Sequence, residues 1–150
     1  MQEKSFQDQG SVSGCYGCGA DNGSGLQIKS YWDGEESVAH YDPKPFHRAG
    51  APEIVYGGLL ASLIDCHSVN LAIATSYKEE NRPIGSDPKI YCVTAQLNIS
   101  FVSPTPMGKT LLLRARVKER SGKKTWISTE LSAEGKICAK AEVLAIKVQR

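Results

Sequence analysis

A glycine pair and a lone aspartate are the residues of this chain best suited to chemistry. Gly57 and Gly58 open a stretch in which Asp65 is the only charged residue as far as Tyr77. The first N–H groups of a helix lack partners within it and mark the positive end of its dipole, so glycines there let a carbonyl oxygen approach closely. Such donors suit the oxygen of a polarised carbonyl. A carboxylate in an apolar helix needs a partner or a catalytic role, which makes Asp65 a candidate general base or nucleophile.

These residues require a helix that begins at the glycine pair and continues to about Tyr77. Apolar residues recur there at helical spacing and cover nearly all of its sides, among them Leu60, Leu63, Ile64, Leu71 and Ala74. Asp65 follows Gly58 by seven residues, or about two turns, so both project from the same side. Because polar residues interrupt what would need to be about 20 mostly apolar ones, we expect no membrane span.

Alternating patterns predict six antiparallel strands around this helix. The expected strands are Leu26–Trp32, Glu36–Tyr41, Tyr91–Phe101, Lys109–Arg120, Thr125–Ala133 and Lys136–Val148. Asp33-Gly34 is a hairpin signal between the first two. In the third strand, Val93 and its alternating apolar neighbours are expected to pack on the helix, which leaves the polar face with Thr94 for a subunit interface or a ligand groove. One helix with such a meander predicts the α+β class.

The helical segment resembles the signature of the hotdog-fold acyl-CoA thioesterases, in the hydroxybenzoyl-CoA and phenylacetyl-CoA thioesterase superfamily. Gly57, Gly58 and Asp65 stand at the positions of that signature, and Tyr56 stands where its histidine usually precedes the glycines. The resemblance covers about residues 15–148 and implies a hotdog fold, in which a curved antiparallel sheet wraps around one long apolar helix. It also implies hydrolysis of acyl-CoA thioesters to free acid and CoA, with CoA as part of the substrate and no cofactor.

The same resemblance implies further site residues and a partner. Thr94 stands where a hydroxyl orients the attacking water or the acid, although strand propensity alone also explains a threonine there. Gly58, with Gly57 beside it, would bind the thioester carbonyl, and Tyr56 would either bind the substrate or pack. In the resembling enzymes the site lies between two subunits, so we expect a homodimer or a dimer of dimers.

Two other functions remain open. A hotdog-fold hydroxyacyl-CoA dehydratase needs a histidine and an acid, which His47 and Asp65 offer, although the usual motif of that group is missing. The alternative from another class is a non-catalytic protein that binds acyl-CoA or lipid, and Tyr56 in place of the histidine favours it. Asp65 argues against such a binder, because a site for an apolar chain has little reason to keep a buried carboxylate.

Two cysteines near the N-terminus have a spacing found in metal and redox sites. Cys15 and Cys18 are separated by two residues, but no second cysteine pair or close histidine pair completes a zinc site, and no βαβ unit supports a redox motif. We therefore expect a glycine-rich turn with packed cysteines and no metal. Enzymes of the resembling group carry a similar turn before their first strand, which here is Cys15–Leu26.

Length and charge bound the remaining possibilities. A chain of 150 residues with 41% hydrophobic residues fits one globular domain, and we expect a single hotdog domain over residues 15–150 after a flexible tail or resting arm at 1–14. A net charge of +2 without a long basic run does not indicate a nucleic-acid partner. The N-terminus lacks the apolar core of a signal peptide, so we expect a cytoplasmic protein with reduced cysteines.

Overall fold

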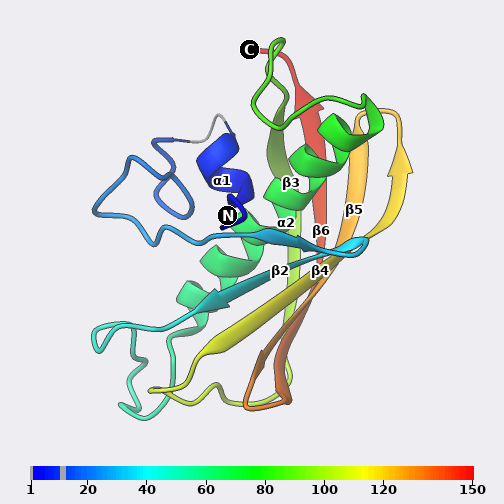
Figure 1. The fold of residues 1–150 in the computed structure, drawn as a ribbon. Coiled ribbons are helices and arrows are strands. Elements are labelled where there is room, and N and C mark those ends of the chain that lie inside the picture. The colour runs from blue at the N-terminus through cyan, green and yellow to red at the C-terminus, as the bar shows by residue number, and fades with distance from the viewer. Residues whose placement is uncertain (1, 11–12) are drawn as a thin grey trace.

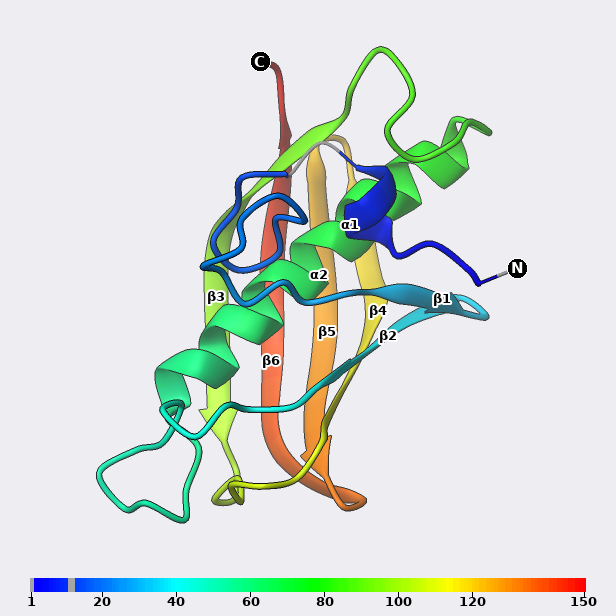
Figure 2. The same ribbon diagram turned by 60° about the vertical axis from the view of Figure 1, so that its left-hand side comes forward.

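The computed structural model describes residues 2–10 and 13–150, which form one sheet, one long helix and an N-terminal arm (Figure 1). In chain order the elements are α1 (Phe6–Gln9), β1 (Tyr31–Asp33), β2 (Glu36–Tyr41), α2 (Gly57–Glu79), β3 (Tyr91–Phe101), β4 (Leu111–Ser121), β5 (Lys124–Ala133) and β6 (Lys136–Val148). The strands lie in the order β1-β2-β4-β5-β6-β3, and every neighbouring pair is antiparallel. The sheet curves around α2 (Figures 1 and 2), which confirms the α+β class and the expected hotdog arrangement.

Helix α2 supplies the centre of the core. Leu63 and Ile64 are fully buried, and so are Leu113, Leu131 and Val143 on the strands. By length and composition α2 is apolar enough to cross a membrane, but 61% of its apolar window is buried inside the protein. The sheet therefore covers the apolar surface of this helix, as expected for the core helix of a folded domain.

The first strand is much shorter than its predicted span of Leu26–Trp32, because the N-terminal loop takes its backbone donors. The N–H of Leu26 donates to the Tyr16 carbonyl (2.8 Å), and the N–H of Ile28 donates to the Gly17 carbonyl (3.2 Å). Pairing with β2 begins only at Tyr31. Residues 26–30 therefore connect the loop to the sheet, and the prediction of a long first strand is wrong.

The N-terminal segment rests on the domain over its described part. Helix α1 buries Phe6, which is 3% exposed and meets the ring of Trp32 edge-on with centroids 5.0 Å apart. Ser5 caps this helix by accepting a hydrogen bond from the Asp8 N–H (3.1 Å). Burial of this aromatic ring stabilises the docked position of residues 5–9. Residues 1, 11 and 12 lie outside the described part of the chain.

A buried hydrogen-bond network joins this arm to α2. His67 is fully buried, with its Nδ1 2.8 Å from the hydroxyl of Ser30 and its Nε2 3.3 Å from the carbonyl of Ser37. Because a carbonyl only accepts, Nε2 carries the proton and Nδ1 accepts from Ser30. Gln7 of the arm donates in turn to the Ser30 hydroxyl (3.0 Å). His67 therefore acts as a neutral structural bridge.

We predict that His67 makes the stability of the fold pH-dependent. Burial lowers the pKa of His67 to about 4, from an ordinary value of about 6.5. Between these values the unfolded chain binds a proton that the folded chain does not, so the free energy of unfolding falls as the pH drops through this window. His67 lowers the free energy of unfolding by about 3 kcal/mol once the pH has fallen to about 4, and none of this loss occurs above about pH 6.5.

Nuclear magnetic resonance of the histidine rings measures this directly. The His67 resonances should stay constant from pH 8 down to about 5. A His67 ring that titrates with a midpoint near 6.5 in the folded protein contradicts the prediction.

Candidate functional site

The start of α2 presents backbone donors without partners. Its cap residue Tyr56 makes no side-chain capping bond, although its own N–H donates to the His47 carbonyl (2.9 Å). Among the described residues, the N–H groups of Gly57 and Gly58 donate to no acceptor. These donors and the helix dipole make the position suitable for an oxygen that carries partial negative charge.

The ring of Tyr56 lies directly against this helix start. A Cβ on Gly58 would stand 2.7 Å from the Cζ of Tyr56, which is closer than two such carbons can approach. Gly57 is less constrained, since a Cβ there would be in ordinary contact with the ring of Phe101 at 3.5 Å. Tyr56 is itself 59% exposed, so its ring can turn away into solvent. In this conformation Tyr56 occupies the space next to the helix start.

Asp65 and Thr94 meet between α2 and the edge strand β3. The Thr94 hydroxyl donates to Oδ1 of the half-buried Asp65, so an unusual charge on the core helix has a specific partner. This bond orients the carboxyl group and leaves its second oxygen free to accept another hydrogen bond. The structure thus brings together two residues that lie 29 positions apart in the chain.

A β-bulge explains why Thr94 faces the helix. Thr94 pairs with Ala145 of β6 and Gln96 pairs with Leu144, which leaves Ala95 as an extra residue. One extra residue exchanges the two faces of the strand, so Thr94 shares the helix side with Leu97 rather than with its predicted polar neighbours. The predicted helix side is therefore right after the bulge, where Ile99 packs on the core and Phe101 lies against Gly57, and wrong before it at Val93, because the alternation in the sequence contains no sign of the bulge.

Strand β3 also leaves much of its apolar surface uncovered. Val93 is 48% exposed and Phe101 57%, and Val102, which follows the strand, is 52% exposed. The strand pairs with β6 on one side only and forms the edge of the sheet. An edge strand with exposed apolar side chains is a surface prone to association.

An apolar cavity of about 510 Å³ opens beside the helix start. Its lining includes Ile54, Gly57, Leu60, Phe101 and Val102. This volume lies within the range of small-molecule sites, about 300–1,000 Å³. Gly57 contributes to its wall, so a ligand in the cavity lies next to the free donors of α2.

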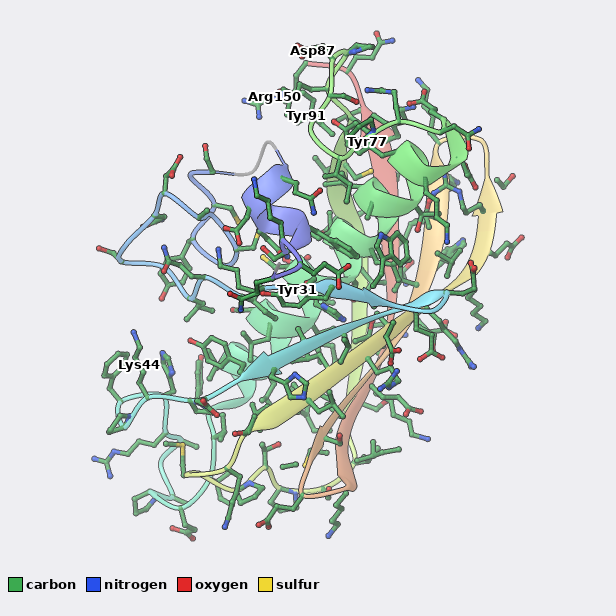
Figure 3. The ribbon with its side chains drawn as sticks, viewed as in Figure 1. Tyr31, Lys44, Tyr77, Asp87, Tyr91 and Arg150 are labelled. Carbon is green, nitrogen blue, oxygen red and sulfur yellow. The ribbon has the colours of Figure 1, made fainter. Side chains whose placement is uncertain are left out.

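His47 does not join the acid. Its Nδ1 accepts a hydrogen bond from the Lys44 N–H (3.0 Å), and its ring packs against Phe46 with centroids 4.6 Å apart. Burial and the nearby Lys44 charge lower the pKa of His47, which favours the neutral ring. Among the described residues, no hydrogen bond links His47 to Asp65. The surrounding loop extends outward at Lys44, away from the end of the molecule that carries Asp87 (Figure 3).

The cysteines form a cluster that the sequence alone does not reveal. The turn of Cys15 and Cys18 rests on Cys66 of α2, and their three sulfur atoms lie within 4.8 Å of one another. Interaction with Cys66 lowers the pKa of Cys18, and the same interaction together with burial raises the pKa of Cys66. Cys66 follows Asp65 in the chain, but nothing in its spacing from Cys18 signals the contact.

Comparison with known proteins places these features in a family. The family model for the thioesterase superfamily matches residues 53–140. A thioesterase superfamily protein from Shewanella loihica PV-4 is 42% identical, with a TM-score of 0.65, over 81% of this chain and 91% of its own. A phenylacetic acid degradation-related protein from Ralstonia eutropha JMP134 is 25% identical, with a TM-score of 0.66, over 81% and 85%.

More distant structures share the fold. The smu.793 protein from Streptococcus mutans UA159, solved with bound acetyl-CoA, is 15% identical with a TM-score of 0.66, over 82% of this chain and 90% of its own. A comparison with curated protein sequences finds no match.

Proposed function

Because the chain belongs to the thioesterase superfamily, we propose that it hydrolyses acyl-CoA thioesters to a free acid and coenzyme A. The observation that carries this proposal is the hydrogen bond between Asp65 and Thr94. Asp65 lies on the same helix that begins with the free N–H groups of Gly57 and Gly58. An acid and a set of oxyanion donors are the two parts that acyl transfer needs. Acetyl-CoA bound to the S. mutans protein, which has the same fold, supports a CoA ester as the substrate.

In the proposed reaction the thioester carbonyl oxygen accepts hydrogen bonds from Gly58 and Gly57. Asp65 takes a proton from a water as this water attacks the carbonyl carbon, or Asp65 attacks the carbon itself and the resulting anhydride is then hydrolysed. In both routes a C–O bond forms, the C–S bond breaks, and the CoA thiolate leaves and takes up a proton. Thr94 holds the carboxyl group in its reactive orientation.

The acyl group fits the apolar cavity beside the helix start. This cavity of about 510 Å³ shares Gly57 with the proposed oxyanion site, so a carbonyl at the helix start directs its acyl chain toward Leu60 and Phe101. Tyr56 must turn away from Gly58 when a substrate binds, and its exposure permits this movement. Its hydroxyl is then available to donate to the substrate.

The separation of Gly58 from Asp65 along α2 favours a site built by two chains. Seven residues separate Gly58 from Asp65, which places them about 10 Å apart along the axis at ~1.5 Å per residue. Reacting groups must come within about 3–3.5 Å of one another, so one chain cannot apply both to the same carbonyl. Two chains related by a two-fold axis would bring Gly58 of one protomer to Asp65 of its partner, and the exposed edge strand β3 is a surface on which they could associate. We therefore propose a homodimer as the active unit, alone or as half of a tetramer.

The observation that favours a second function is the ring of Tyr56 against Gly58. A protein that only binds acyl-CoA needs no open oxyanion site, and this ring lies against one of the two glycines that would form it. Such a binder releases no CoA from any ester, yet acyl-CoA raises its melting temperature. Hydrolysis and protection against unfolding therefore distinguish the two functions in the same samples.

We predict that Asp65→Asn lowers kcat by at least about a hundredfold, because the amide cannot accept the proton or attack the carbonyl. Release of free thiol from a panel of acyl-CoA esters measures the rate. The matched control is Asp87→Asn, since Asp87 is exposed and lies outside the proposed site. Full activity of folded Asp65→Asn would refute the mechanism.

We predict that activity depends on the hydroxyl group of residue 94 and not on the shape of its side chain. Thr94→Val keeps the volume but loses the donor to Asp65, and we expect kcat to fall about tenfold or more, as for hydrogen bonds to charged groups. Thr94→Ser keeps the hydroxyl and should retain most of the activity. Equal rates for both variants would assign Thr94 to strand structure alone.

Mixing two inactive variants tests the shared site. Asp65→Asn and Gly58→Val each remove one part, so each homodimer should be inactive. A mixed dimer has one site with both parts intact, and random association restores about a quarter of the parent activity per chain. The variants are unfolded together and refolded, with each variant refolded alone as the control. Absence of restored activity in mixed dimers shown to form by differential tagging would place both parts on one chain.

A further inference from the structure

The three-cysteine cluster has the dimensions of a metal site. The Sγ atoms of Cys15 and Cys66 lie 3.8 Å apart, and Cys18 completes a triangle within 4.8 Å. A tetrahedral Zn²⁺ with Zn–S bonds of ~2.3 Å holds two sulfur ligands about 3.8 Å apart. A disulfide would need ~2.05 Å. We propose that Cys15, Cys18 and Cys66 bind Zn²⁺ through three thiolates.

The loop that carries two of these ligands is held in place by its own hydrogen bonds. The N–H of Gly19 donates to the Cys15 carbonyl (2.8 Å), and the N–H of Asp21 donates to the Ser13 carbonyl (2.9 Å). A Cβ on Gly17 would overlap the sulfur of Cys66, so glycine at this position lets the turn approach α2 closely. The loop thus presents its two thiols to the third one before any ion arrives, which reduces the entropy lost on binding.

The surroundings favour a cation over a bare cluster of thiolates. Among the described residues, no lysine or arginine hydrogen-bonds to any of the three sulfur atoms, and Asp65 adds a negative charge next to Cys66. A soft divalent cation neutralises this charge, and thiolate ligands select Zn²⁺ over harder ions. The Asn70 amide donates to Cys18 (3.4 Å) and to the Cys66 carbonyl (2.7 Å), as a residue that orients ligands does.

The exposures of the ligands suit a site with one open position. Cys18 is 2% exposed, Cys66 is half-buried and Cys15 is exposed, so solvent reaches the ion from the Cys15 side. A water molecule then completes the tetrahedron. Each cysteine loses its thiol proton to solvent as it binds, and no oxidant or reductant is consumed.

This ion would connect the N-terminal loop to the core helix. Cys15 and Cys66 are 51 residues apart, and Cys66 lies next to Asp65 on α2. The cross-link fixes the loop against the turn of α2 that presents the acid. The site is independent of thioester hydrolysis, because its ligands and its test involve no substrate.

Cobalt binding tests the site without any measurement of activity. The full chain is reduced, freed of metal with a chelator and titrated with Co²⁺. One equivalent should produce an intense near-ultraviolet thiolate-to-cobalt band and the visible bands of tetrahedral Co²⁺, and Zn²⁺ should abolish them. Zn²⁺ should also raise the melting temperature of the parent protein. A parent that shows no thiolate band at saturating Co²⁺ overturns the proposal.

Matched variants assign the ligands. Cys15→Ser, at an exposed position, should weaken Co²⁺ binding at least tenfold and remove the melting shift with Zn²⁺, and Cys66→Ser should do the same. Cys92→Ser, outside the cluster, should bind as the parent does. Gly17→Ala keeps all three ligands but pushes the turn away from α2, so it should bind more weakly than the parent. Unchanged binding by Cys15→Ser and Cys66→Ser would overturn the site.

Discussion

Helix α2 is enclosed by the sheet and the N-terminal loop, so its buried polar groups need partners inside the protein, and among the described residues most have one while the hydroxyl of Thr75 does not. A polar group buried without a hydrogen bond costs several kcal/mol, on the order of 2–7. His67 satisfies this requirement through Ser30 and Ser37, and the Ser68 hydroxyl pairs with that of Thr129 at 2.7 Å. Asp65 satisfies it through Thr94, at the edge strand where the cover of the helix ends. Helix α2 therefore contributes to both the core and the candidate site, and its turns differ in how completely the sheet covers them.

The helix also determines how the site parts relate to one another. Its rise of about 1.5 Å per residue separates Gly58 from Asp65 by about 10 Å along the axis, and this separation is the reason for proposing a dimer as the active unit. Its rotation of about 100° per residue directs Asp65 and Cys66 to different neighbours, namely β3 and the cysteine turn. One turn of α2 thus contacts both the proposed catalytic threonine and the proposed metal site.

Much of the fold and part of the site could be predicted from local patterns. The apolar run after Gly57 predicted α2, and the boundaries of β2, β3 and β6 agree with the alternating segments. The pattern failed at residues 26–30, where backbone N–H groups donate to carbonyls of the N-terminal loop instead of to the sheet. It failed again in β3, because Ala95 looks like any other strand residue and only the pairing with β6 reveals it as a bulge.

The sequence by itself determined the core helix, the glycine pair at its start, the position of Asp65 seven residues later and the α+β class. These depend on residue type and on spacings of a few positions, which helix and strand geometry convert directly into faces. Only the tertiary structure decided that Thr94 meets Asp65, that Cys66 completes a triangle with Cys15 and Cys18, and that His47 stays apart from the acid. Such contacts join segments tens of residues apart. They depend on strand register and on the path of the loops, which leave no periodic signal in the sequence.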